Sequence, residues 1–329
     1  MSSVGTPWLW AGFSLLIAGL LALDLGVFHR RAHEIRPREA LAWSVVWIAL
    51  ALLWGAGVWW RFGPERGLEY LTGYLIEKAL SVDNIFVFLV IFSYFGVPAE
   101  AQHRVLFWGI VGAVAFRMVF ILAGAALLAA FHWTIYLFGA VLVITGIRML
   151  RGREPEVHPE RHPVIRWLKR RLPLVARYHG GRFAVREAGR LRATPLVLAL
   201  VTVELSDILF AVDSIPAIFA VTRDPFIVYT SNIFAILGLR ALYFLLAGLL
   251  ARLRYLHVGL GLVLVFVGIK MVLAEVAPIP IGLSLLVVAG LIGTAAAASV
   301  VRPEVRAPAG GGASAAPPPD VPHPDAPRS

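Results

Sequence analysis

The chain contains no cysteine and few charged residues. Without cysteine it can form neither disulfide bonds nor metal sites with thiolate ligands. Charged residues make up 15% of the 329 residues, against about 25% in an ordinary soluble protein. The phosphate-binding Walker A motif is also missing, so ATP is not the direct energy source for any work that the chain does. These absences argue against a soluble domain, a disulfide scaffold and an ATP-driven pump.

Hydrophobic residues make up 59% of the chain and are gathered in long apolar runs. A run of about 20 residues crosses the hydrocarbon core as a helix, whereas the strands of a membrane barrel would alternate over about 10 residues. We therefore predict an all-α polytopic membrane protein. The nine expected spans lie near residues 8–28, 40–60, 68–95, 105–130, 132–150, 195–221, 226–251, 255–273 and 279–301. The first is expected to be retained, because no basic segment precedes it as in a signal peptide.

The positive charge is concentrated in loops on one side of the predicted membrane. The net charge is +10, and residues 151–194 alone hold twelve Arg or Lys against four Glu. Residues 29–39 and the pair Arg252 and Arg254 add further basic side chains on that side. Basic loops mark the cytoplasmic face of a membrane protein. We therefore predict that the N-terminus lies outside and the C-terminus in the cytoplasm, and we expect no nucleic-acid partner.

The sequence leaves two interpretations of the basic loop, residues 151–194, open. Pro163–Val175 mixes apolar with basic residues, so it is either a solvated loop or a short helix lying on anionic lipid headgroups. The tail, residues 302–329, is rich in Pro, Gly and Ala and is predicted to be disordered.

An internal repeat divides the apolar part of the chain. SVDNI at 81–85 matches AVDSI at 211–215, and another acid stands six residues before each Asp, at Glu77 and Asp207. GAVLVITGIRM at 139–149 matches GLVLVFVGIKM at 261–271. Each unit has three predicted spans, so the two units should run in opposite directions through the bilayer. This is the 3+3 inverted repeat that is common in secondary transporters.

The repeat gives the predicted organisation of the chain. Two N-terminal spans (1–67) are followed by the first repeat unit (68–150), the basic cytoplasmic loop (151–194), the second unit (195–273), a last span (274–301) and the tail (302–329).

Five acidic residues lie inside two of the predicted spans. The third span carries Glu77 and Asp83, and the sixth carries Glu204, Asp207 and Asp213. A carboxylate at the bilayer centre costs about 2.5–3.5 kcal/mol on insertion scales, so packing alone does not explain the set. In a straight helix Asp83 and Asp213 would point about 100° away from the stripes formed by Glu77, Ser81 and Asn84 and by Asp207, Ala211 and Ser214. Either protein covers several faces of these helices, or the helices unwind locally, as Pro216 suggests for the sixth span.

These acids could instead form static ion pairs with cations inside the membrane. The available cations are Lys78, Arg117, Arg148, Arg240 and Lys270. Arg117 and Arg240 lie deepest, where they are expected to pair with a site carboxylate or to help a gate move. Arg148 and Lys270 lie near span ends, where a long side chain can reach the headgroups. Asp24 is a lone acid late in the first span, for which the sequence leaves a functional and a structural role open.

The polar side chains inside the spans offer only oxygen ligands. They are carboxylates, hydroxyls and the amides of Asn84 and Asn232, whereas the histidines lie in loops, in the tail or at span ends. Oxygen-only sites suit hard divalent cations such as Mn²⁺, Mg²⁺ and Ca²⁺ better than Zn²⁺ or Cu⁺. The chemistry alone leaves protons and monovalent ions open.

Several motifs resemble the TerC family, specifically its longer Alx-like branch. They are Glu77 with Asp83 and Asn84, Thr-Pro at 194–195, Glu204 with Asp207, FAVDSIPA at 210–217, PFIV at 225–228 and TSNIFAILGLR at 230–240. The resemblance covers about residues 10–275. Members of the family are associated with tellurite resistance, the response to alkaline pH and the export of manganese from the cytosol.

The resemblance implies a manganese exporter in the bacterial inner membrane. The residues that it implies at or near the metal are Glu77, Asp83, Asn84, Asp207, Asp213 and Asn232. Auxiliary candidates are Asp24, Glu204, Ser214, Arg117 and Arg240. Mn²⁺ is then the transported substrate, and neither a tightly bound cofactor nor an enzymatic activity is expected.

Residues and resemblance together predict a secondary transporter that exports a hard divalent cation in exchange for protons. The alternative from another class is a membrane scaffold or a subunit of a stress-response complex, in which the acids only help assembly. An intramembrane protease is a more distant alternative, because the acids recur by repeat symmetry and no protease motif accompanies them.

Overall fold

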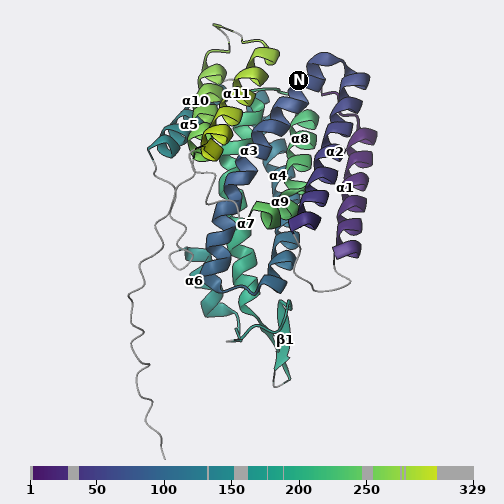
Figure 1. Ribbon diagram of the computed structural model, residues 1–329, viewed down its shortest axis with the longest axis vertical. Helices are drawn as coiled ribbons and strands as arrows, with labels where there is room; N and C mark the ends of the chain where they lie inside the picture. Colours follow the sequence, from purple (N-terminus) through teal and green to yellow (C-terminus); the bar gives the residue numbers. More distant parts are fainter. Residues whose placement is uncertain are drawn as a thin grey trace, which may run out of the picture.

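The chain is a bundle of helices with one small β-hairpin (Figure 1). The computed structural model describes residues 3–28, 37–131, 133–151, 162–175, 177–187, 189–246, 255–274, 276–277 and 279–301. The first six helices are α1 (Pro7–Phe28), α2 (Pro37–Phe62), α3 (Pro64–Phe95), α4 (Ala99–Ala130), α5 (Thr134–Leu150) and α6 (Pro163–Arg171). The strands β1 (Ala184–Glu187) and β2 (Arg190–Ala193) follow. The remaining helices are α7 (Pro195–Phe219), α8 (Pro225–Leu237), α9 (Leu239–Leu246), α10 (Leu256–Val272) and α11 (Ile281–Val301). The predicted disordered tail lies outside the described residues.

Proline marks where many of these helices begin. Pro64, Pro163, Pro195 and Pro225 stand in the first turn of α3, α6, α7 and α8. Proline fits there because its fixed φ suits a helix and its missing N–H would have no partner in the first turn. At the far end of α3, Gly96 adopts the left-handed conformation with φ of 61° and closes the helix. The connections from α2 to α3, from α3 to α4 and from α7 to α8 are accordingly short.

Each predicted apolar segment is helical where the structure describes it, but two local features differ from the prediction. The predicted seventh span, 226–251, is divided at Gly238 into α8 and α9. Pro216 does not unwind the sixth span, because it lies in the last turn of α7, which continues to Phe219. A proline there removes a hydrogen bond only where the helix is about to end.

The basic loop contains more structure than the sequence predicted. Part of the segment is helical, because α6 forms over Pro163–Arg171 with Ile165 fully buried and Trp167 exposed. The hairpin of β1 and β2, which turns at the positive-φ residue Gly189, was not predicted. Its strands have four residues each, too few to give a clear alternating pattern.

Six helical segments of the described chain are long and apolar enough to cross a membrane. They are α1, α2, α4, α7, α8 taken with α9, and α11. The apolar helices α5 and α10 are shorter, at 17 residues each. Large apolar side chains lie exposed on outward faces, for example Leu15 on α1, Leu53 on α2 and Leu286 on α11, each 69–74% exposed. Such a surface suits lipid tails rather than water, as in an integral membrane protein.

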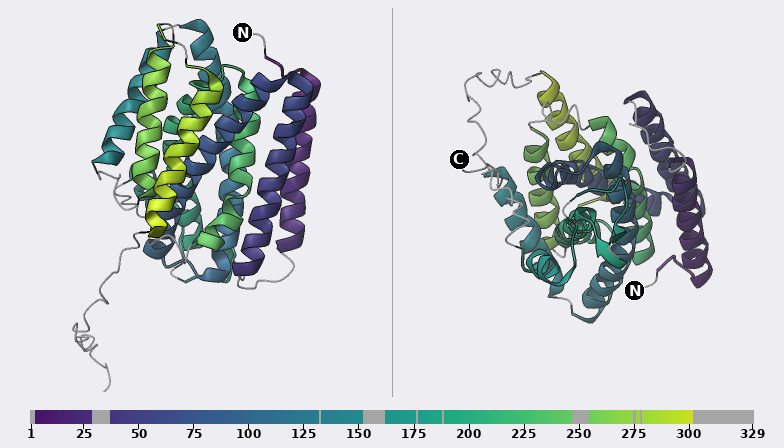
Figure 2. Two further views of the ribbon diagram at one scale, coloured as in Figure 1. Left: turned by 45° about the horizontal axis from the view of Figure 1, so that its top comes forward. Right: turned by 90° about the horizontal axis from the view of Figure 1, so that it is seen from below.

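The helices are arranged around α3, α4, α7 and α8. Helices α3 and α7 pack against each other, α4 packs on α7, and α8 packs on both α3 and α4. Helices α1 and α2 stand together at one edge of the bundle, and α5, α10 and α11 stand at the opposite edge (Figures 1 and 2). The α6 helix and the hairpin lie at the end of the bundle opposite the N-terminus (Figure 1).

Glycines bring α5 and α10 into direct backbone contact. A Cβ on Gly146 would lie 2.6 Å from the carbonyl oxygen of Gly261, and one on Gly268 would lie 2.7 Å from that of Gly139. The lower-numbered glycine of α5 thus faces the higher-numbered one of α10, so the helices run antiparallel. Small residues allow this close approach between helices in a membrane.

Candidate ion site

Arg117 is the centre of a polar group buried in the middle of the bundle. It lies on α4, and its side chain has no exposed surface. Its Nε and Nη2 donate to the two carboxylate oxygens of Asp207 on α7, at 3.2 and 2.9 Å. This two-pronged contact matches the planar guanidinium to the planar carboxylate, which is the strongest geometry for such a pair.

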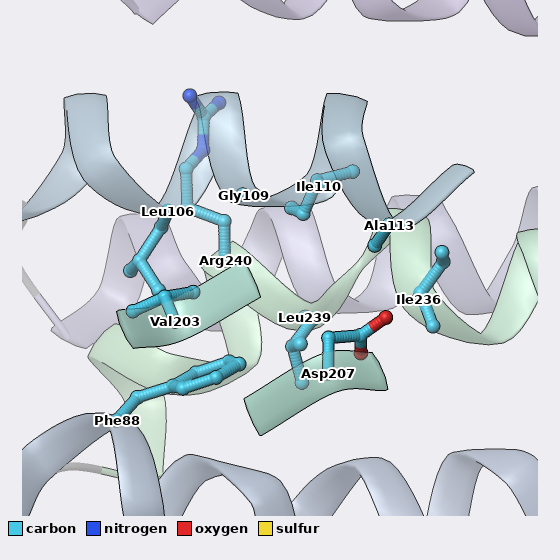
Figure 3. A pocket seen from close by; sticks show the side chains of 10 residues that line it. All are labelled: Phe88, Leu106, Gly109, Ile110, Ala113, Val203, Asp207, Ile236, Leu239 and Arg240. Atoms are coloured by element: carbon cyan, nitrogen blue, oxygen red, sulfur yellow. The ribbon is translucent and has the colours of Figure 1, made fainter. Parts of the chain in front are cut away.

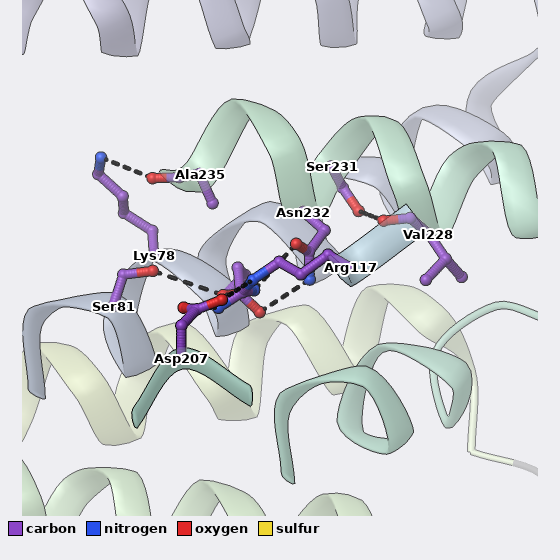
Figure 4. Close-up of polar contacts among 9 residues, drawn as sticks. Lys78, Ser81, Arg117, Asp207, Val228, Ser231, Asn232 and Ala235 are labelled. Atoms are coloured by element: carbon purple, nitrogen blue, oxygen red, sulfur yellow. Dashed lines mark hydrogen bonds and ion pairs between the residues drawn. The ribbon is translucent and has the colours of Figure 1, made fainter. Parts of the chain in front are cut away.

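Two further helices complete this group (Figure 4). Arg117 Nη1 donates to Glu77 Oε1 on α3 and, at 2.9 Å, to Asn232 Oδ1 on α8. Asn232 Nδ2 in turn donates to Glu77 Oε2 at 3.0 Å, and Ser81 Oγ lies 3.5 Å from Glu77 Oε1. We call Glu77, Arg117, Asp207 and Asn232 the central cluster. Its members come from four different helices.

The central cluster is closed to solvent and lies deep in the bundle. Glu77, Arg117 and Asn232 are 0% exposed, and Asp207 is 5% exposed. Asp207 is the middle residue of the 25-residue α7. With both acids ionised the cluster has two negative charges and one positive charge. Removing one partner from such a buried pair costs about 3–5 kcal/mol, so the four side chains depend on one another.

A second buried ion pair joins α1 to α9. Arg240 Nη2 donates to Asp24 Oδ1, and both side chains are nearly inaccessible. Arg240 and Asp207 also line a cavity of about 10 Å³, roughly the space of one water molecule (Figure 3). Gly109, Ile110 and Ala113 of α4 form part of its wall. The cavity therefore lies between the central cluster and the second ion pair.

The remaining predicted residues lie away from this closed group or at its margin. Asp213 is half-buried and accepts a hydrogen bond of 2.9 Å from Thr145 on α5. Asn84 is buried and Asp83 half-buried further along α3. Ser214 is buried, and within the described part of the chain its hydroxyl makes no hydrogen bond. The central cluster thus contains three of the six predicted metal residues.

Glu204 lies beside the central cluster on α7. Its carboxylate rests against Gly112 of α4, where a Cβ would overlap it. Its Oε2 atom is buried and accepts no hydrogen bond from the residues that the structure describes. The absence of a side chain at Gly112 is what leaves room for this acid.

Lys78 has a role that the sequence did not indicate. Its Nζ donates at 3.1 Å to the carbonyl oxygen of Ala235, in the last turn of α8. That carbonyl has lost its helical partner because the helix is interrupted at Gly238. A cation at a helix C-terminus also interacts favourably with the helix dipole. Lys78 therefore stabilises a helix end inside the bundle, rather than a carboxylate as the ion-pair hypothesis had proposed.

The oxygen atoms of the central cluster are the kind of ligand that suits a hard cation. They belong to two carboxylates, an amide and the nearby Ser81 hydroxyl. The described residues include no group of three His, Asp or Glu side chains that could share one metal ion. Any cation held at this position would therefore be bound by two acids with neutral oxygens beside them.

The sequence model of the integral membrane protein TerC family matches residues 62–306. The chain belongs to the TerC family. An uncharacterized membrane protein of Myxococcus xanthus, STKORF319, is 57% identical over 300 residues, which cover 91% of this chain and 94% of the relative. Alx of Escherichia coli K12, named as a proposed membrane-bound redox modulator, is 50% identical over 301 residues, which cover 89% of this chain and 94% of Alx. No solved structure was found to match the chain.

The match to the TerC family includes the whole central cluster but only one member of the second ion pair. All four members of the central cluster lie within residues 62–306, whereas Asp24 lies before them. The family match thus begins at the last residue of α2, and Asp24 of α1, which lies before it, pairs with Arg240 inside it. The chain is accordingly a multi-pass integral membrane protein of the TerC family.

Proposed function

We propose that this protein is a secondary transporter that exports a hard divalent cation, Mn²⁺ above all, from the cytosol. The observation that carries this proposal is the central cluster: two acids from repeat-equivalent positions converge with Asn232 at the middle of the bundle. Burying such groups is costly in a membrane, and they typically mark ion pathways. Oxygen donors alone favour Mn²⁺, Mg²⁺ or Ca²⁺ over softer metals.

We propose further that nine segments cross the membrane and that the repeat units are inverted. Gly139 and Gly146 of the first unit correspond to Gly261 and Gly268 of the second. The contacts pair Gly139 with Gly268 and Gly146 with Gly261, which is the reciprocal pattern of a two-fold axis. The interruption at Gly238, close to Asn232 and Arg240, supports this too, because transporters commonly place broken helices at their ion sites.

The orientation proposed from the basic loops places α6 and the hairpin in the cytoplasm. The exposed Trp167 of α6 would then meet the inner headgroups, where its neighbours Lys169, Arg170 and Arg171 attract anionic lipids. The chain would lie in the bacterial inner membrane with its N-terminus outside.

Proton exchange supplies the energy in this proposal. Moving a divalent cation outward against an inside-negative potential of 100 mV costs about 4.6 kcal/mol, at about 2.3 kcal/mol per charge. Two protons that enter in exchange cancel this electrical term. Carboxylates along the ion path can accept these protons when the metal ion leaves.

The redox role named for Alx would be indirect in this chain. With no cysteine it has no thiol and disulfide couple of its own. Control of the cytosolic level of a redox-active metal such as manganese would connect the export proposed here with the redox role named for Alx. The alternative role as a membrane scaffold predicts no transport by the isolated protein.

Neutralising the central acids tests the proposal in cells that lack their own manganese exporter. Glu77→Gln and Asp207→Asn should each lower manganese export at least about tenfold, because loss of about 1.4 kcal/mol already gives that factor. Glu187→Gln, on the exposed hairpin, is the matched control and should export normally. Normal export by both cluster variants would contradict the proposal. Lower membrane abundance without lower export per molecule would favour the scaffold.

A further inference from the structure

Arg117 occupies the position that a cation would need in the central cluster. Four oxygens accept hydrogen bonds from its guanidinium: Glu77 Oε1, Asn232 Oδ1 and both carboxylate oxygens of Asp207. A metal ion bound by these residues would use the same oxygens. The side chain and the ion therefore cannot both be bound there.

The net charge of the central cluster also favours exchange of Arg117 for the metal ion. With both acids ionised, the cluster carries −2 + 1 = −1 with Arg117 in place. A divalent cation that replaced the guanidinium would give −2 + 2 = 0, whereas both cations together would give +1. Uncompensated charge is costly in a buried site, so exchange is favoured over joint occupancy.

Glu204 offers Arg117 a second place to bind. It stands three residues before Asp207 on α7, so it lies on the same face one turn away. Its carboxylate rests against Gly112, which lies five residues, about 1.4 turns, before Arg117 on α4, and side chains on a helix lean toward that end. The buried Oε2 atom of Glu204 is without a hydrogen bond among the described residues. A buried acceptor without such a bond thus lies on the helix that Arg117 already contacts, one turn from Asp207.

We propose that Arg117 is the resident cation of the empty transporter and that it moves from Asp207 to Glu204 when a divalent ion binds. This inference rests on the proposed function and adds that a side chain of the protein itself competes with the metal ion for the central acids. Arg117 keeps the two central acids compensated when no ion is bound. Glu204 receives Arg117 without binding the metal itself.

The test measures Mn²⁺ binding to the purified full-length protein in detergent by calorimetry. Arg117→Gln removes the competing charge and keeps a hydrogen-bond donor, so Mn²⁺ should bind at least about tenfold more tightly than to the native protein. Lys78→Gln is the control, because it removes one positive charge beside Glu77 without emptying the site. It should change the affinity by less than about threefold.

Glu204→Gln tests the second position. In the native background it should weaken Mn²⁺ binding at least about fivefold, because Arg117 loses its alternative acceptor. In the Arg117→Gln background it should have no effect. Such a double-mutant cycle separates this indirect role from direct coordination.

Each outcome decides the matter. Unchanged or weaker Mn²⁺ binding by Arg117→Gln would overturn the proposal and make Arg117 a static partner of the acids. An equal loss of affinity from Glu204→Gln in both backgrounds would also overturn it, because Glu204 would then be a metal ligand. If Arg117→Gln does not fold, Arg117→Lys, which makes fewer bonds to the acids, should still tighten binding, and unchanged affinity would overturn the proposal. Absence of any Mn²⁺ binding by the folded native protein would overturn the proposed function as well.

Discussion

Arg117 explains how two acids can lie side by side in the middle of this bundle. Its guanidinium satisfies Asp207 with two parallel bonds and Glu77 with a third, and Asn232 closes the group by bonding both Arg117 and Glu77. Every acceptor in this group has a donor, so the burial cost is largely offset. The same completeness means that an ion can enter only by replacing bonds that already exist.

Asp213 differs from Glu77 and Asp207 because its partner is neutral. Its carboxylate accepts from the Thr145 hydroxyl and remains half-buried. Asparagine in its place can still accept that bond, so Asp213→Asn should change the unfolding temperature little. Glu77→Leu should destabilise the protein by about 3 kcal/mol or more, because Arg117 is left buried with one carboxylate fewer. Thermal unfolding in detergent makes the comparison.

Export should nevertheless fall at least about tenfold in Asp213→Asn, since a formal charge is removed from the proposed ion path. Cytosolic manganese in cells that express each variant measures this effect. Near-normal export by both Asp83→Asn and Asp213→Asn would restrict the site to the central cluster.

The elements position these side chains through two kinds of contact. Phe13 of α1 packs on Trp54 of α2 and on Phe226, Tyr229 and Phe234 of α8, which attaches α1 to the core. At the opposite edge, α5 and α10 approach through glycine. Aromatic rings thus fill the contacts of α1 with α2 and α8, and glycines allow the close contact between α5 and α10.

A side chain at the narrow contact should separate α5 from α10. Gly268→Ala places a methyl group 2.7 Å from the carbonyl oxygen of Gly139, which is too close for real atoms. Forcing extra atoms into a packed contact costs about 1–3 kcal/mol, so the unfolding temperature in detergent should drop. Gly290→Ala on α11, where no atom lies within 4 Å of the new methyl group, should keep or raise it. Equal stability of the two variants would argue against the close packing.

The helices could be predicted from the sequence because apolar runs and proline positions mark them directly. The interruption at Gly238 could not, because a single glycine in an apolar run is compatible with a continuous helix. Repeat matching identified Glu77 and Asp207 as equivalent, and the depth of Arg117 predicted that it pairs with a site carboxylate. Helical spacing did not show that Arg117 would contact both acids. That contact joins residues 90 positions apart, from Arg117 to Asp207, and depends on how α4 packs between α7 and α8. Glu204 and Gly112 meet for the same reason.

For the molecule as a whole, the two ends of the bundle should face different compartments. The hairpin lies at one end and the N-terminus at the other (Figure 1). The chain has no cysteine, so single cysteines can be introduced without removing any. Ala277→Cys, between α10 and α11, should react with an impermeant maleimide in intact cells, whereas Ala184→Cys on β1 should react only after the membrane is opened. Both positions are exposed, and labelling of Ala184→Cys in intact cells would reverse the topology.

Manganese flux by the purified protein in liposomes tests the central claim most directly. The vesicles would contain a manganese-sensitive dye, and Mn²⁺ uptake would be followed with and without a proton gradient directed outward. The account predicts uptake that the gradient accelerates, alkalinisation of the vesicle interior, and at least about tenfold slower uptake by Asp207→Asn. Folded native protein that moves no Mn²⁺ under either condition would contradict it.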